Sequence, residues 1–369
     1  MNSSNTGPKE NISTSQAAVM VINYMLGAGI LTLPRTTAEA VRTPDTWISI
    51  IVSGLIILVA GWILVSLCKR FQGKTWFQFV PEITGKWIAF ILSLLVIGFF
   101  VVISAFEIRI LAEVTGLFLL EDTPIWAIVL PFMWIGLYLT LGGINCIARL
   151  YEIILPITLV FLVLSLLLSS TIFELDNLRP VLGSGIMPVL RGIKPTLLSF
   201  TGYEIMLVAT AFMKFPKKAT SAVIIGISVP VLMYTFTVIM VVGGMSIDGV
   251  VTRAWPTLDL MRSFEVQGLI FERFESLLLV IWIMQIFSTY TVTLYAASLG
   301  WSQVFNKKFR PFVFALLPVI FLIAMIPKDV TEAFKLGDTV GYASVSLFGV
   351  IPLMLLLVSL VRKKGAKSK

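Results

Sequence analysis

The chain has 369 residues, 57% of them apolar and 13% charged, and its mean hydropathy is +0.96. This much apolar surface exceeds what a soluble core can bury, so the composition excludes a soluble protein and indicates an integral membrane protein. The net charge of +8 comes from basic residues at the ends of apolar segments, which argues against a nucleic-acid-binding stripe. The absence of histidine argues against hydrolase chemistry and His-containing metal sites. We therefore expect no enzyme activity, no cofactor and no metal site.

The apolar segments follow one another with short breaks, which predicts an all-α integral membrane protein with a single membrane domain over residues 13–361. Residues 1–12 are polar, and we expect them to form a cytosolic tail. The first apolar segment contains Gln16 and Asn23 and lacks a small-residue cleavage site, so it is predicted to be a retained helix. Residues 362–369 are predicted to form a basic cytosolic tail.

Stretches of about 20 mainly apolar residues can cross a bilayer as helices, and the sequence contains ten such stretches. An even number of spans places both termini on one side of the membrane. The loops and tails of that side hold 17 Lys and Arg residues but three acidic ones, so the positive-inside rule predicts that both termini are cytosolic. The predicted spans cover residues 13–38, 46–68, 86–116, 124–143, 148–170, 189–213, 219–244, 273–303, 310–326 and 338–361.

Glycine and clustered polar residues interrupt the first and sixth predicted spans. Residues 27–34 read Gly-Ala-Gly-Ile-Leu-Thr-Leu-Pro, and residues 199–204 read Ser-Phe-Thr-Gly-Tyr-Glu. Two broken helices at corresponding places in two five-helix halves are typical of an inverted-repeat transporter fold, here with repeats over residues 13–170 and 189–361. The alternative is that the glycines of the first break only permit close helix packing.

These two breaks form the candidate ligand site. A broken helix in a membrane leaves unpaired amides at one half-helix start and unpaired carbonyls at another half-helix end. A zwitterionic amino acid complements both, with its carboxylate at the first break and its ammonium group at the second. Phe200 and Tyr203 can form an apolar wall for the ligand side chain, although aromatic residues in a membrane span also serve as plain packing. The candidate residues are Gly27, Ala28, Gly29 and Ile30 at the first break and Ser199, Phe200, Thr201, Gly202 and Tyr203 at the second.

Charged side chains within membrane spans are costly and usually functional. Glu107 lies midway along the third span, and Glu204 immediately follows the second break. Each can bind a cation, take up a proton or pair with Arg109. Arg109 is two residues from Glu107 and points across the helix from it, which makes a direct pair between them unfavourable. We expect Glu107 to be buried.

The longest polar stretch, residues 245–275, lies between the seventh and eighth spans. Within it, residues 257–264 have the apolar spacing of a helix, which predicts a short helix across the outer mouth of the bundle. This helix either caps the bundle or provides a contact surface for a partner protein.

The eighth span carries the densest cluster of polar residues within the membrane. Ser288, Thr291 and Tyr295 share one helix face, so this face can present three hydroxyls to the bundle interior. The alternative is that Ser and Thr hydroxyls bond carbonyls of their own helix. Ser288 is a candidate for ion or proton coupling, together with Glu107 and Glu204.

Several stretches resemble the B subunits of bacterial spore germinant receptors, which are the spore germination branch of the amino acid/polyamine/organocation transporter superfamily. The resemblance covers essentially the whole chain. Its glycine motif is shared by the wider superfamily, whereas the Arg-Pro and Glu-Arg-Phe-Glu runs are more particular to the germination branch. The stretches that carry it are Gly27-Ala28-Gly29-Ile30-Leu31 with Pro34, Leu178-Arg179-Pro180-Val181-Leu182 with Gly192 and residues 199–204, and Phe271-Glu272-Arg273-Phe274-Glu275-Ser276.

The resemblance implies a leucine-transporter-like fold of five plus five helices with the first and sixth broken. It also implies a place in the inner membrane of the spore and assembly with an A and a C subunit. In the resembling fold the eighth helix borders the substrate site, so Thr291 and Tyr295 are the preferred side-chain contacts. Some proton-coupled relatives in the superfamily carry a lysine in the fifth helix in place of a sodium ion. Residues 148–170 contain no lysine, which disfavours that mechanism.

The leading hypothesis is a nutrient-sensing receptor subunit that binds a small amino acid at the two breaks and signals to its partner subunits. One alternative is a secondary amino acid transporter coupled to sodium or protons. Another is a ligand-gated ion-conducting subunit, in which hydroxyl and carbonyl groups line an ion path. The expected partners are a small-molecule ligand, the lipid bilayer and the A and C subunits, and no nucleic acid.

Overall fold

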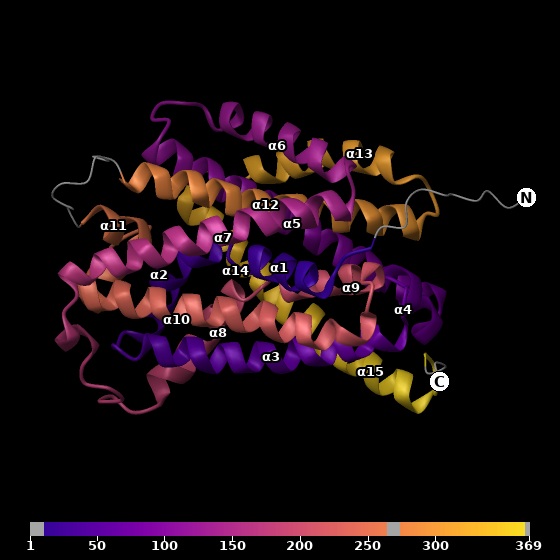
Figure 1. The fold of residues 1–369 in the computed structure, drawn as a ribbon, viewed down its shortest axis with the longest axis horizontal. Helices are drawn as coiled ribbons and strands as arrows, with labels where there is room; N and C mark the ends of the chain where they lie inside the picture. Colours follow the sequence, from indigo (N-terminus) through magenta and orange to yellow (C-terminus); the bar gives the residue numbers. More distant parts are fainter. Residues whose placement is uncertain (1–10, 264–273, 366–369) are drawn as a thin grey trace, which may run out of the picture.

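The computed structural model describes residues 11–263 and 274–365. Over this part the chain is a bundle of helices that run mainly along its long axis, and the start of α1 and the end of α15 lie at the same end of the bundle (Figure 1). Residues 1–10 and 366–369 of the two predicted tails lie outside the described residues. So do Phe264, at the end of the predicted outer helix, and residues 271–273 of the Glu-Arg-Phe-Glu motif.

The first half of the chain contains the broken first span, four further helices that correspond to predicted spans, and one short helix that was not predicted. The short helix, α4, begins after the capping residue Thr75. The elements are α1 (Thr14–Met25), α2 (Gly29–Val41), α3 (Thr46–Arg70), α4 (Trp76–Thr84), α5 (Lys86–Phe118), α6 (Ile125–Leu141) and α7 (Ile144–Leu168), followed by 3-10 turns at Ser169–Ile172 and Leu175–Leu178.

The second half repeats this order with a more interrupted sixth span. The predicted outer helix appears as α11, which occupies Pro256–Arg262. The elements are α8 (Met187–Ser199), a 3-10 turn (Tyr203–Ile205), α9 (Met206–Ala209), 3-10 turns (Thr210–Phe212 and Pro216–Lys218), α10 (Ala219–Val251), α11, α12 (Phe274–Val304), α13 (Phe309–Met325), α14 (Val330–Ser344), a π-helical segment (Val345–Val350) and α15 (Ile351–Val361).

Six helices of the described part are long and apolar enough to cross a membrane, and the bent pair of α1 and α2 makes a seventh span. The shorter apolar helices α6, α13 and the segment Tyr203–Phe212 fall within the other three predicted spans. The last predicted span was too short at its start, because its helix begins at Val330 and not at residue 338. The charged residues Glu332 and Lys335 lower the hydropathy before residue 338, but the helix includes them.

The centre of the bundle is formed by α1 and α12. The most apolar stretch of α12 is 83% buried, whereas the corresponding stretches of the other long helices are 28–56% buried. Helix α12 packs along α5 and α7, and α1 lies against α7, α10 and α12. A helix buried in this way is a core element, whereas the outer helices expose apolar side chains to lipid.

The two broken helices are joined near the end of the bundle that holds the start of α1. The backbone N–H of Ile12 donates to the Phe212 carbonyl at 2.8 Å, and the Lys214 N–H donates to the Ile12 carbonyl at 2.9 Å. Ser13 and Gln16 then form a capping box that begins α1. The segment before α1 is therefore fixed to the segment after the second break.

Candidate ligand site at the two helix breaks

The first break separates α1 from α2 and bends the pair by 52°. Gly27 allows other helices to approach closely, because a methyl group on it would lie 2.4 Å from Thr289 Oγ1 and 3.0 Å from Glu107 Oε1. Gly29, the first residue of α2, does the same, since a methyl group there would lie 2.4 Å from the Tyr234 hydroxyl. The two glycines therefore lie at a true break and also permit close packing.

One face of α12 supplies hydrogen-bond donors to the carbonyls at the first break. The three donor residues are spaced at i, i+3 and i+7, which places them on one side of the helix, and all three are buried. Carbonyls at a helix end need such partners inside a membrane, where water does not reach them. Gln285 Nε2 donates to the Asn23 carbonyl, Thr289 Oγ1 to the Tyr24 carbonyl at 3.1 Å, and Trp282 Nε1 to the Gly27 carbonyl at 3.2 Å.

The second break follows Ser199, the last residue of α8. Gly202 has a φ of 139°, a conformation that favours glycine. A methyl group on Gly202 would lie 2.9 Å from the backbone nitrogen of Met25. The two breaks therefore touch at Gly202 and Met25, as the inverted-repeat prediction requires.

Each break has one buried carboxyl group that accepts a hydrogen bond from a backbone amide. The Glu107 oxygens lie 3.2 and 3.4 Å from the Ala28 nitrogen, and Glu204 Oε2 lies 2.7 Å from the Gly202 nitrogen. Glu107 is 4% exposed, which confirms that it is buried. Arg109 does not pair with it, because its guanidinium lies 2.5 Å from Glu113. No ion pair in the described part of the chain involves either carboxyl group.

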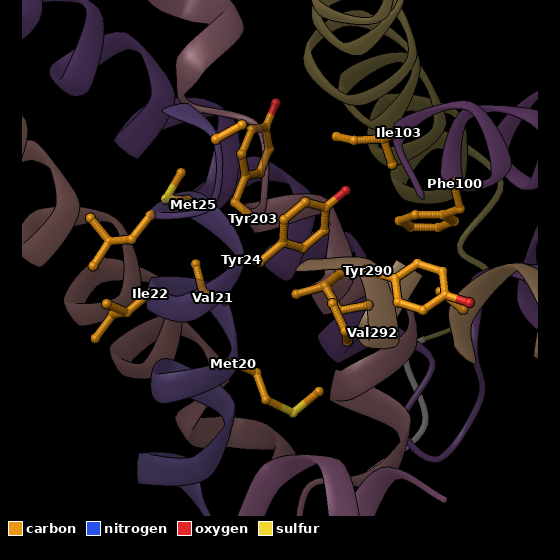
Figure 2. Close-up of a cluster of buried hydrophobic side chains, with 14 of the residues drawn as sticks. Met20, Val21, Ile22, Tyr24, Met25, Phe100, Ile103, Tyr203, Tyr290 and Val292 are labelled. Atoms are coloured by element: carbon orange, nitrogen blue, oxygen red, sulfur yellow. The ribbon is translucent and has the colours of Figure 1, made fainter. Parts of the chain in front are cut away.

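Tyr24 lies near both carboxyl groups, since it lines the same cavity as Glu107 and neighbours Glu204. Figure 2 shows Tyr24 within a buried cluster that draws side chains from α1, α5 and α12, with Tyr203 from the second break. The Tyr24 side chain and the Glu204 carboxyl are both buried and interact with each other. Tyr24 of α1 therefore links the first break to the carboxyl group of the second.

A cavity of about 210 Å³ borders both breaks and extends to the ends of α2 and α14. Its inner wall combines Gly29 and Ser199 with the Glu107 carboxyl, and its outer part is more strongly charged. Arg35 Nε lies 2.8 Å from Glu39, and its guanidinium lies over the ring of Phe334. The lining residues are Tyr24, Met25, Gly29, Thr32, Arg35, Thr36, Glu39, Ile103, Phe106, Glu107, Ser199, Thr201, Thr331, Phe334, Lys335, Gly337, Asp338 and Val340.

The structure brings the residues predicted at the two breaks together, but only some of them line the cavity. Gly29, Ser199 and Thr201 line the cavity. Phe200 and Tyr203 are buried but are not among its lining residues, and the Phe200 ring lies 5.3 Å from that of Tyr234. The other predicted residues, Gly27, Ala28, Ile30 and Gly202, are the backbone of the breaks themselves.

The residues predicted on the eighth span lie elsewhere in the bundle. The Thr291 hydroxyl lies 2.8 Å from the Tyr151 hydroxyl and also 2.8 Å from the carbonyl of Phe287 in its own helix. The Tyr295 ring packs at 5.3 Å from Phe309. Ser288 Oγ donates to the Met284 carbonyl at 3.1 Å, the own-helix bond considered as the alternative. Ligand contacts by Thr291 and Tyr295, and ion coupling by Ser288, stay predictions.

The sequence did not identify the contribution of α14 to the cavity. Phe334, Lys335 and Asp338 line it with Arg35 and Glu39 of α2. Arg35 and Glu39 are four residues apart, a spacing that signals an ion pair on one helix face. Phe334 and Lys335 lay before the last predicted span and Asp338 was its first residue, so nothing in the sequence placed them beside the first break.

Solved structures share this fold. MhsT, whose structure is in complex with L-phenylalanine, superimposes with a TM-score of 0.66 over 96% of this chain and 99% of MhsT, at 12% sequence identity. Mhp1, a nucleobase-cation-symport-1 family transporter with bromovinylhydantoin bound, superimposes with a TM-score of 0.62 over 98% of this chain and 82% of Mhp1, at 16% identity. The chain is thus an integral membrane protein of leucine-transporter-like fold, as the resemblance implied.

The sequence assigns the chain to one family within this fold. Residues 11–333 match the family model described as spore germination protein. The chain is 51% identical to spore germination protein YndE of Bacillus subtilis, with 98% of this chain and 99% of YndE covered. It is 36% identical to spore germination protein A2 of the same organism, with 96% and 98% covered, and 34% identical to spore germination protein B2, with 96% and 97% covered. The protein belongs to the spore germination protein family.

Proposed function

We propose that the protein is the nutrient-binding subunit of a spore germinant receptor and that its ligand is a small amino acid. The observation that carries this proposal is the cavity of about 210 Å³ that borders both helix breaks. Polar backbone groups, one buried carboxyl group and apolar side chains converge on this cavity, a combination typical of small-molecule sites. The proposed receptor also contains an A and a C subunit and lies in the spore inner membrane, with both termini of this chain cytosolic.

The groups around the cavity suggest how an amino acid is held. The Ala28 amide is already bonded to Glu107, so the ligand carboxylate would use the next amides at the start of α2, those of Gly29 and Ile30. The ligand ammonium group would bind the Glu107 carboxyl and the Ser199 carbonyl. An ammonium group between these acceptors makes charge-assisted hydrogen bonds, which are stronger than neutral ones.

The hydrogen bonds from α12 support a sensor over an ion-coupled transporter. A coupling cation at a broken helix is coordinated by backbone carbonyls that lack protein donors. Here the carbonyls of Asn23, Tyr24 and Gly27 already accept bonds from side chains of α12. A cation at these carbonyls would have to displace three buried donors, so we infer that ligand binding does not require sodium.

The test is ligand-induced thermal stabilisation of the purified protein in nanodiscs, with the twenty amino acids, sugars and nucleosides in sodium-containing and sodium-free buffer. A ligand at a hundred times its Kd should stabilise the native protein by about 2.7 kcal/mol. We expect one or more small amino acids to do so in both buffers. Glu107→Gln should weaken binding by on the order of 1–3 kcal/mol, because the charge-assisted bond is lost.

Glu121→Gln is the matched control, since Glu121 is exposed at the end of α5 and away from the cavity. Wild-type affinity in a folded Glu107→Gln protein would contradict the proposed ligand orientation. Stabilisation that appears only with sodium, together with uptake of labelled amino acid into proteoliposomes, would favour the secondary transporter instead.

A further inference from the structure

Tyr234 of α10 contacts both helix breaks through one hydroxyl group. This hydroxyl donates a hydrogen bond to the Met25 carbonyl at the end of α1, and it also lies 3.2 Å from the Ser199 carbonyl at the end of α8. Tyr234 is completely buried, so water does not compete for these contacts. A single atom therefore links the two half-helices on either side of the candidate site.

The surroundings of Tyr234 hold the hydroxyl in this position. Gly29 leaves the necessary space, because a methyl group there would lie 2.4 Å from the hydroxyl oxygen and 3.1 Å from the Ser199 carbonyl oxygen. The Phe200 ring lies 5.3 Å from the Tyr234 ring and inclined to it by 56°. Residues of both breaks thus enclose one tyrosine from a third helix.

The Met25 and Ser199 carbonyls compete for the single hydroxyl proton of Tyr234. A tyrosine hydroxyl carries one proton and can donate one full hydrogen bond at a time, whereas two carbonyl oxygens face it here. In the ligand-free protein, one of the two buried carbonyls is always left with a weak bond or none. A ligand amine that reaches Ser199, which lines the cavity, can supply the missing donor.

We propose that Tyr234 is a ligand-released latch between the two breaks. Without ligand, its hydroxyl proton is shared between the Met25 and Ser199 carbonyls and holds α8 to α1. When a ligand amine donates to the Ser199 carbonyl, the Tyr234 hydroxyl donates its hydrogen bond to the Met25 carbonyl alone. The link between α8 and α1 through this hydroxyl is then lost. Tyr234 is a positioning residue in this scheme, and the amine is the part of the ligand that the protein senses. The ligand-dependent part rests on the function proposed above, whereas the link in the ligand-free protein does not.

The first arm of the test needs no ligand. Hydrogen exchange of the full-length protein in nanodiscs is compared between wild type, Tyr234→Phe and Tyr290→Phe. Tyr290 is the matched control, because it is also fully buried but its hydroxyl makes only a 3.5 Å contact to the Met133 carbonyl. Tyr234→Phe should speed exchange in peptides covering residues 20–30 and 195–205, and Tyr290→Phe should leave both unchanged. Unchanged exchange of both breaks in Tyr234→Phe would overturn the latch.

The second arm uses L-alanine and propionate, which differ by the amino group. In Tyr234→Phe the Ser199 carbonyl has no donor before binding, so the amine gains a bond without displacing one. The ratio of the propionate Kd to the alanine Kd should therefore rise by about fivefold over wild type, the factor that corresponds to about 1 kcal/mol. A purely structural role would change both affinities equally, and an unchanged ratio would overturn the coupling between amine and latch. If neither L-alanine nor propionate binds the wild-type protein, the proposed ligand class is wrong. The hydrogen-exchange arm then still tests whether Tyr234 links α8 to α1.

Discussion

The two helix breaks face the same cavity but are stabilised in different ways. At the first break, side chains from other helices hold the backbone: Gln285 and Thr289 of α12 donate to its carbonyls, and Glu107 of α5 accepts from the Ala28 amide. At the second break, the Gly202 amide donates to Glu204, two residues further along the chain, and Tyr234 of α10 is the side chain from another helix that contacts the Ser199 carbonyl.

This difference indicates that the first break is a fixed scaffold and the second break is the part that adapts to a ligand. A backbone held by side chains of α5, α10 and α12 can move only if several buried bonds break together. A backbone held by its own neighbours can change conformation with fewer losses. Signalling in the proposed receptor would then begin at α8 and α9 and not at α1.

The largest effect on stability and binding is expected from a substitution that fills the space where both breaks contact Tyr234. In Gly29→Val, the added side chain would overlap the Tyr234 hydroxyl. We therefore expect the free energy of unfolding to fall by about 1–3 kcal/mol and ligand binding to be lost. Thermal unfolding and ligand titration measure both effects. Gly98→Val is the control, because a methyl group at Gly98 meets no atom within 4 Å. A folded Gly29→Val protein with full affinity would place the ligand away from the first break.

The scaffold role of the first break is tested by removing one donor of α12. Gln285→Leu leaves the buried Asn23 carbonyl without its donor, so we expect the free energy of unfolding to fall by about 1–3 kcal/mol. Thr237→Val is a suitable control, since the buried Thr237 hydroxyl bonds only its own helix, at the Met233 carbonyl. Equal, small effects of the two substitutions would mean that α12 does not hold the first break.

The smallest effect is expected at the second break. Glu204→Gln keeps a side-chain oxygen that can accept the Gly202 N–H, so the free energy of unfolding should change by less than about 1 kcal/mol. Thermal unfolding of Glu204→Gln and Gln285→Leu in the same nanodiscs gives the comparison directly. If Glu204→Gln is the more destabilising of the two, the second break is the more rigid one and the assignment of roles is reversed.

Local sequence signals predicted the features that depend on local chemistry. Glycine and polar clusters located both breaks, because an interrupted helical ladder needs such residues within a membrane. The position of Glu107 within a long apolar segment predicted its burial. The spacing of residues 257–264 predicted α11, which ends at Arg262.

Features that depend on how helices face one another were not predictable in this way. The eighth span has polar residues on more than one face, and spacing alone does not show which face meets α1. The predicted face held Thr291 and Tyr295, whereas the face that bonds the first break holds Gln285 and Thr289. Lys335 of α14 was likewise placed outside the last predicted span, which began at residue 338, although it lines the cavity.

The two backbone bonds of Ile12 limit how the molecule can move. They fasten the start of α1 to the chain on both sides of Met213, and Ile12 itself is completely buried. At that end, the two broken helices therefore cannot slide or separate without breaking both bonds. We therefore expect any widening of the cavity to occur as a rotation of the broken helices about these two bonds. The same two bonds transmit any force on the segment before α1 to both broken helices at once.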